Sequence, residues 1–214
     1  MDSKELYSYV DHTVLKAYTT WEEIKKLCQE AIKYGMASVC IPACYIKRVH
    51  EEFPKLNICT VVGFPLGYSS TEGKVAETKQ ALADGAKEID MVINICDVKN
   101  GEYQKAEDEI AILKKAVGEK TLKVIIETCY LTEEEKIAMC KAVTNAKADY
   151  IKTSTGFGTA GATLEDVILM RKHIGPEVKI KAAGGIRSKA DMEAYIEAGC
   201  SRIGTSSAIS MLGE

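Results

Sequence analysis

Short runs of β-branched and apolar residues alternate with amphipathic helical stretches along the whole chain, and this alternation constrains the fold more than any other feature. We expect eight strands, each followed by a helix, after an N-terminal helix near Lys4–Val10. The expected strands are Thr13–Leu15, Ala37–Ile41, Ile58–Val62, Glu88–Asn94, Leu122–Glu127, Tyr150–Thr153, Val178–Ala182 and Arg202–Thr205. Eight such units predict an α/β protein that closes on itself as a (β/α)8 barrel. An open doubly wound sheet is the alternative, but no nucleotide-binding glycine pattern supports it.

The ends of the expected helices carry the residues that begin and stop helices. Thr20, Thr132 and Ser188 are expected N-caps, and Thr132 with Glu135 fits a capping box. Three glycines stand where helices should end: Gly35, Gly85 and Gly199. Since no linker or low-complexity tract divides the chain, we expect residues 1–214 to form a single barrel domain.

Composition excludes several classes of protein. With 28 basic against 31 acidic residues and a net charge of −3, the chain lacks the basic excess that would point to a nucleic-acid ligand. A hydrophobic fraction of 46% is that of a globular protein, and no apolar run approaches the roughly 18 residues of a membrane span. The N-terminal segment is too polar for a signal peptide, and the eight cysteines form no CxxC pair. We therefore expect reduced thiols and a cytoplasmic location.

A weak internal repeat aligns four of the expected strands. Each follows the end of a helix, and the equivalent strand position holds Cys40, Asp90, Lys152 and Gly204. These fall on strands two, four, six and eight, and alternate strands of a barrel contribute to the same interior layer. A layer with Cys, Asp and Lys is chemically unusual, because bulky aliphatic residues normally fill such interiors.

Two lysines and one aspartate are the catalytic candidates. Alternation along the sixth strand points Lys152 into the barrel, where a partly neutral amine could attack a carbonyl and form a Schiff base. Lys181 on the next strand lies close enough for its charge to disfavour protonation of a neighbouring amine. Asp90 supplies the compensating carboxylate and a route for proton transfer. For each residue the alternative is a purely structural ion pair, while Lys179 fits a solvated start of its strand.

Glycines and hydroxyl residues follow the last three strands and indicate a phosphate site. Barrels commonly bind phosphate in the loops after strands seven and eight, with a short helix N-terminus. Any one of these residues could form an ordinary turn or cap, but together they favour a site at one end of the barrel. They are Thr155, Gly156, Gly184, Gly185, Gly204, Ser206 and Ser207.

Metal chemistry has little support in the sequence. The three histidines His12, His50 and His173 are scattered and lack the spacing of metal ligands. His12 fits a structural histidine best, and Cys40 fits a small thiol that fills the barrel. We therefore expect neither a metal ion nor an organic cofactor.

Seven segments, in order along nearly the whole chain, resemble the deoxyribose-phosphate aldolase family. They are DHTVLKA (11–17), VCIPACY (39–45), VVGFPLG (61–67), EIDMVIN (88–94), KTSTGF (152–157), KAAGGIR (181–187) and GTSS (204–207). The resemblance implies that Lys152 forms the Schiff base, that Lys181 tunes it and that Asp90 shares proton transfer with Lys181. It also implies that Asp11 and Cys40 line the substrate pocket.

The resemblance implies reversible cleavage of 2-deoxy-D-ribose 5-phosphate to D-glyceraldehyde 3-phosphate and acetaldehyde, by a homo-oligomer, a dimer or tetramer. Two features depart from some family members: Phe157 replaces a basic residue, and the chain stops at Glu214 without a longer tail that carries a tyrosine. A different barrel enzyme acting on sugar phosphates, another Schiff-base aldolase or an isomerase, is an alternative. A non-catalytic sensor of phosphorylated ligands is a third, which the set of Lys152, Lys181 and Asp90 disfavours.

Overall fold

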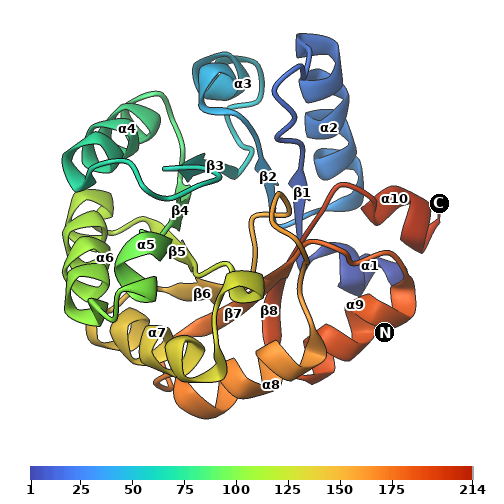
Figure 1. The fold of residues 1–214 in the computed structure, drawn as a ribbon. Helices are drawn as coiled ribbons and strands as arrows, with labels where there is room; N and C mark the ends of the chain where they lie inside the picture. The colour runs from blue at the N-terminus through green and yellow to red at the C-terminus, as the bar shows by residue number, and fades with distance from the viewer. Residues whose placement is uncertain (214) are drawn as a thin grey trace.

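Eight parallel strands pair in sequence order, and the first pairs with the last, so that the sheet is a closed barrel surrounded by helices (Figure 1). This is the (β/α)8, or TIM-barrel, architecture, and it excludes the open doubly wound sheet. The computed structural model describes residues 1–213. The strands are β1 (Val10–Thr13), β2 (Ser38–Cys40), β3 (Ile58–Val62), β4 (Glu88–Val92), β5 (Thr121–Ile125), β6 (Tyr150–Lys152), β7 (Lys179–Ala183) and β8 (Cys200–Thr205).

Helices cover the barrel on the outside. They are α1 (Ser3–Tyr7), α2 (Trp21–Tyr34), α3 (Ile46–Glu52), α4 (Thr71–Ala83), α5 (Ile95–Lys99), α6 (Tyr103–Val117), α7 (Glu133–Asn145), α8 (Leu164–His173), α9 (Lys189–Glu197) and α10 (Ala208–Leu212), with short 3-10 helices η1 (Ala43–Tyr45) and η2 (Thr128–Tyr130). The capping box of Thr132 and Glu135 is confirmed, and Thr20 and Ser188 also cap their helices. No helix within residues 1–213 has the length and apolar character that crossing a membrane requires.

The first strand lies earlier in the chain than its expected position, Thr13–Leu15. The N-terminal helix ends at Tyr7 rather than Val10, because Val10 and Asp11 pair with Ile203 and Gly204 of β8. Closure of the barrel therefore determines where β1 begins, and no local pattern in the sequence reveals that pairing. The extra helix α1 lies beside α9 and α10 (Figure 1), where the Tyr7 hydroxyl donates to the Gly213 carbonyl.

The two faces of each strand have different surroundings. Ile89, Ile151 and Ile180 belong to the large hydrophobic core between the strands and the helices. Inside the barrel the apolar contacts are few: Cys40, Cys59 and Val61 form a small cluster, with Leu15 and Phe64 packed against it. Most free energy from apolar burial therefore comes from outside the barrel, and much of the interior holds polar groups.

Candidate active site

A cavity of about 440 Å³ opens at the end of the barrel where the strands finish. Its walls come from the loops after β1, β6, β7 and β8. All of the residues expected to bind phosphate line it: Thr155, Gly156, Gly184, Gly185, Gly204, Ser206 and Ser207. The Lys152 side chain also lines this cavity and is 5% exposed.

The three catalytic candidates meet beside the cavity, and Lys152 is the one of the three that lines it. Lys152 and Lys181 are paired in register on β6 and β7. Both ammonium groups lie 2.7 Å from the same oxygen, Oδ2 of Asp90 on β4. Lys181 and Asp90 are fully buried. The strand alternation therefore correctly predicted that these side chains point inward and converge.

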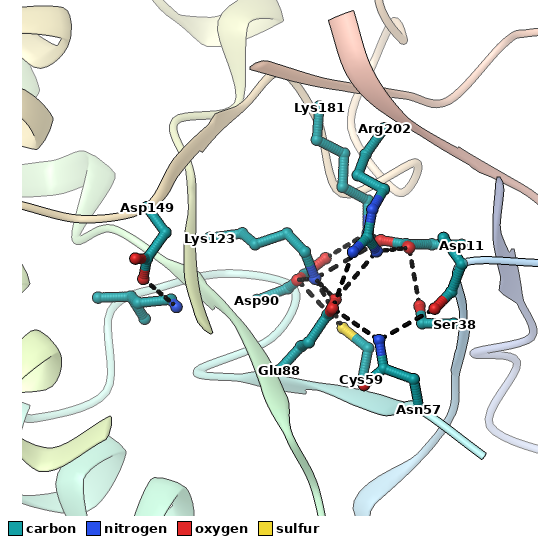
Figure 2. Close-up of polar contacts among 12 residues, drawn as sticks. Asp11, Ser38, Asn57, Cys59, Glu88, Asp90, Lys123, Asp149, Lys181 and Arg202 are labelled. Carbon is teal, nitrogen blue, oxygen red and sulfur yellow. Dashed lines mark hydrogen bonds and ion pairs between the residues drawn. The ribbon is translucent and has the colours of Figure 1, made fainter. Parts of the chain in front are cut away.

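A wider ionic network extends this trio towards the other end of the barrel (Figure 2). Lys123 of β5 is fully buried and lies 2.6 Å from Glu88, 2.8 Å from Asp90 and 3.5 Å from Asp11. Arg202 of β8 binds Glu88 at 2.9 Å and also binds Asp11. The Asp11 carboxylate accepts hydrogen bonds from Lys181 and, at 2.7 Å, from Ser38.

These contacts determine which groups are charged. Burial by itself would raise the pKa of Asp90, but Lys123, Lys152 and Lys181 hold it well below its usual range. The pKa of Asp11 is likewise lowered, because Lys181, Lys123 and Arg202 outweigh its burial. Burial would lower the pKa of Lys181, but Asp11 and Asp90 raise it above its ordinary value. Lys181 is therefore a firmly held ammonium group, in contrast to the general expectation that a buried lysine becomes neutral.

Counting charges distinguishes Lys152 from the other cations. The network holds three carboxylates, Asp11, Glu88 and Asp90, and four basic side chains, Lys123, Lys152, Lys181 and Arg202. Lys152 contacts one of these carboxylates, whereas Lys181 contacts two and Lys123 contacts three. Lys152 is therefore the base with the fewest carboxylate partners in the network.

The residues of the expected interior layer differ in their access to the cavity. Lys152 and Gly204 line it, whereas Cys40 and Asp90 do not. A Cβ on Gly204 would lie 3.1 Å from Cε of Lys181, so that glycine leaves the room that Lys181 occupies. Asp11 and Cys40 are fully buried and do not line the cavity. The structure thus places both below the cavity floor, and their contact with a substrate stays a prediction.

Two loops shape the cavity wall. Glu127, which has a left-handed backbone (φ 50°), accepts hydrogen bonds from the Thr155 amide at 3.1 Å and from its hydroxyl. Gly184 has φ 81°, and a Cβ there would approach Cα of Gly161 to 3.1 Å, so only glycine suits this position. Since the Thr155 side chain binds Glu127, it holds the loop after β6 in place.

The aromatic residue at position 157 lies at the mouth of the cavity. Phe157 lines the cavity, and its ring packs edge-on against Phe64 with 5.2 Å between ring centroids. Two cations that sequence reasoning did not single out, Lys16 and Arg187, also line the cavity. Both stand in loops, where no hydrophobic periodicity reveals the direction of a side chain.

The charged residues Lys123, Glu88 and Arg202 were also missed as members of the site. A signal was available for Lys123, because it stands between Leu122 and Val124 in an apolar strand and has inward parity. Arg202 and Glu88 stand near the starts of their strands, where a solvated side chain is the ordinary interpretation.

Two groups of side chains within residues 1–213 contain three possible metal ligands. Their donor atoms lie within 4.8 Å of one another, and Cys59 belongs to both: Cys40, Cys59 and Asp90, and Asp11, Cys59 and Glu88. Lysine or arginine nitrogens already contact every one of these carboxylates, so the ligand set suits an ion-pair network better than a metal. His12 lies apart and pairs with Glu30 at 2.8 Å, as a structural histidine does.

Comparison with known proteins agrees with this geometry. The model of the DeoC/LacD family aldolases matches residues 6–210. A deoxyribose-phosphate aldolase of Clostridium botulinum (strain Alaska E43 / Type E3) is 68% identical over 213 residues, which cover 99% of this chain and 96% of that protein. The enzyme of the same name from Clostridioides difficile (strain 630) is 58% identical, over 98% of this chain and 96% of that protein.

Solved structures agree as well. The aldolase QR15 superposes with a TM-score of 0.93 at 38% identity, covering 97% of this chain and 94% of that chain. A tetrameric deoxyribose phosphate aldolase from Aeropyrum pernix superposes with a TM-score of 0.91 at 31% identity, covering 99% of this chain and 91% of that chain. The fold, the lysine–aspartate cluster and these similarities agree, and the chain belongs to the DeoC/LacD family of aldolases, which are carbon–carbon lyases.

Proposed function

We propose that this protein reversibly cleaves 2-deoxy-D-ribose 5-phosphate to D-glyceraldehyde 3-phosphate and acetaldehyde through a Schiff base on Lys152. The names of its relatives supply the substrate class. The position of Lys152 carries its assignment. Of the lysines in the network within residues 1–213, it alone lines the cavity. It also has fewer carboxylate partners than Lys181 and Lys123.

The reaction begins when the amine of Lys152 attacks the aldehyde carbon of the open-chain sugar. Loss of water gives an iminium ion, which draws electrons from the C2–C3 bond as the C3 hydroxyl loses its proton. Glyceraldehyde 3-phosphate leaves and an enamine remains on Lys152. Protonation of the enamine at C2 and hydrolysis of the iminium release acetaldehyde and regenerate the amine.

Asp90 and Lys181 serve proton transfer in this proposal. Oδ2 of Asp90 accepts from both lysine nitrogens at 2.7 Å, so a proton can pass between them through one carboxylate. Because the pKa of Asp90 is held well below its usual range, the carboxylate is a weak base by itself. We therefore assign the transfer to the Asp90–Lys181 pair together, with Asp11 keeping Lys181 charged and oriented.

The phosphate of the substrate is assigned to the loops after β7 and β8. Gly184 and Gly185 have no side chains that would cover their backbone on the cavity side. Ser206 and Ser207 directly precede α10. Lys16 and Arg187 line the same cavity and add positive charge. The phosphate would thus be held away from Lys152. The aldehyde end of the open-chain sugar would then lie at the Lys152 amine.

No metal or organic cofactor is needed for this reaction, because the iminium ion serves as the electron sink. We further propose a homo-oligomer, a dimer or tetramer, since the Aeropyrum pernix relative is described as a tetramer. The cytoplasmic location stays a prediction.

Reductive trapping tests the Schiff base. Substrate with borohydride should inactivate the enzyme, and peptide mass spectrometry should find the stable secondary amine on Lys152. Lys152→Arg should abolish trapping, because a guanidinium stays protonated and is not nucleophilic. An adduct on Lys181 with Lys152 unmodified would reverse their roles. Failure to release acetaldehyde from 2-deoxyribose 5-phosphate, while another sugar phosphate is trapped, would overturn the proposed substrate.

A further inference from the structure

Two thiols lie side by side inside the barrel, next to the lysine–aspartate cluster, and the proposed reaction uses neither as a nucleophile. Cys40 on β2 and Cys59 on β3 are register partners on adjacent parallel strands, and both are fully buried. Their sulfur atoms lie within 4.8 Å of each other and of the Asp90 carboxylate. Cα atoms on paired strands are about 4.8 Å apart, within the range of about 4.4–6.8 Å that disulfides span.

Cys59 is bound to the charged cluster. Its sulfur lies 3.1 Å from Oδ1 of Asp90 and accepts from the Lys123 ammonium at 3.2 Å. The other oxygen of Asp90 accepts from Lys152 and Lys181. Any movement of the Cys59 sulfur therefore changes the contacts of the carboxylate that holds both lysines.

We propose that Cys40 and Cys59 are a redox modification site, at which hydrogen peroxide forms a reversible disulfide that switches off the active site. This goes beyond the proposed aldolase reaction, which involves no oxidation or reduction. Leu15 both lines the cavity and packs against the pair, so the route for hydrogen peroxide runs from the cavity past this side chain.

The chemistry is a two-step transfer of oxygen and sulfur. The Cys40 thiolate attacks one peroxide oxygen; the S–O bond forms, the O–O bond breaks, and the departing hydroxide takes up a proton to become water. The Cys59 sulfur then attacks the sulfenic sulfur of Cys40, the S–S bond forms, and hydroxide leaves with the Cys59 proton as a second water. Two thiols are oxidised and one peroxide is reduced.

The environment assigns these two roles. Hydrogen bonding with Cys59 lowers the pKa of the Cys40 thiol, and the Lys181 ammonium group acts in the same direction, against burial and the nearby Asp90 carboxylate. Burial and the neighbouring Cys40 raise the pKa of Cys59 well above its ordinary value. Cys40 is therefore the thiol that attacks peroxide, and Cys59 is the resolving thiol.

The disulfide should inactivate the enzyme through Asp90. A disulfide sulfur carries no proton, so Cys59 can no longer donate to Oδ1 of Asp90 once the S–S bond forms. The loss of a hydrogen bond to a charged group corresponds to a fall in activity of roughly tenfold to hundredfold.

The experiment uses the full-length protein with the two exposed cysteines replaced, Cys44→Ser and Cys96→Ser. Replacing Cys44 is necessary because Cys40 and Cys44 share one tryptic peptide, while Cys59 lies in another. After treatment with hydrogen peroxide and alkylation, non-reducing peptide mapping should find the Cys40 and Cys59 peptides cross-linked. Activity should fall in proportion to the cross-link and return with dithiothreitol.

Two controls separate this reaction from general oxidation. Cys140 is buried in the outer core, where burial raises its pKa to about 12, and it should stay reduced and become alkylated after denaturation. Cys59→Ala should show no inactivation that dithiothreitol reverses, with activity expressed relative to its own untreated sample. If that variant does not fold, Cys59→Ser replaces it, and the peptide map of the parent protein still decides.

Three results would overturn the proposal: Cys40 and Cys59 both still alkylatable after peroxide has inactivated the enzyme, a cross-link without loss of activity, or reversible loss that persists in the Cys59 variant. The mass measurement does not depend on the substrate. A cross-link that appears in a protein without aldolase activity would therefore refute the proposed function and not the presence of the disulfide.

Discussion

Replacing Lys123 by methionine removes the cation with the most carboxylate partners from the barrel interior and keeps most of its volume. Lys123 lies 2.6 Å from Glu88, 2.8 Å from Asp90 and 3.5 Å from Asp11, and its side chain is fully buried. Removal of one member of a buried ion pair typically costs about 3–5 kcal/mol, because the remaining charge has lost its partner. We expect a fall in unfolding free energy of that size, measured by urea denaturation.

The more informative effect of this substitution is electrostatic. Lys123 and Lys152 bind opposite oxygens of Asp90. At an effective dielectric of about 20, two charges separated by a few ångströms interact by a few kcal/mol. Without Lys123 the network has one more uncompensated negative charge, which favours the ammonium form at Lys152. The pH at which borohydride trapping reaches half its plateau should therefore rise.

The chain offers a matched control in Lys74→Met. Lys74 is also a fully buried lysine, and its ammonium lies 2.9 Å from both oxygens of Glu109 and 2.8 Å from the Val92 carbonyl, outside the lysine–aspartate cluster. This variant should lose comparable stability and leave the pH of half-maximal trapping unchanged. Equal pH profiles for folded Lys123→Met, folded Lys74→Met and the parent protein would refute the electrostatic argument.

Three further predictions concern metal, phosphate and acid. Treatment with EDTA should leave activity intact, and strong loss that zinc restores would rule out the metal-free mechanism. Ser206→Asp should raise KM for 2-deoxyribose 5-phosphate at least about tenfold more than for unphosphorylated deoxyribose, because a carboxylate repels the phosphate; equal losses would locate the phosphate elsewhere. Because ion pairs hold the pKa of Asp90 and Asp11 below their unfolded values, their stabilisation is complete above the unfolded value of about 3.9 and is lost as the pH falls further. Urea titrations should show a constant unfolding free energy from about pH 8 to 5 and a steep fall below about 4, and stability that rises in acid would contradict this sign.

Much of the fold could be predicted because its determinants are local. Strands in a barrel alternate between two different environments, so Ile151 and Lys152 have opposite directions that parity alone reveals. Helix ends are similarly local, as the capping box of Thr132 and Glu135 illustrates. The predicted start of β1 is wrong because the true start depends on pairing with β8, some 190 residues further along the chain. Such pairing is a property of the closed barrel and leaves no trace near Val10.

The residues of the candidate site could be predicted only where a charged side chain interrupts an otherwise apolar strand. Lys152 stands out because a charged residue in a buried strand is costly, and Asp90 stands out for the same reason. Arg202 and Glu88 lie near the beginnings of strands, where charge is ordinary, so sequence reasoning missed them. The firmly held charge of Lys181 depends on the distance from its nitrogen to two carboxylates, which no single strand contains.

The number of carboxylate partners per lysine falls along the barrel, and this gradient supports the proposal that Lys152 is the nucleophile. Buried ion pairs seldom add to stability, and this chain obtains its apolar stabilisation from the core outside the strands. The interior is therefore free to hold charges whose arrangement serves chemistry. Lys123, deepest in the network, has three carboxylate partners, Lys181 has two, and Lys152 at the cavity has one. The lysine with the fewest carboxylate partners is thus the one that lines the cavity, as the proposed Schiff base requires.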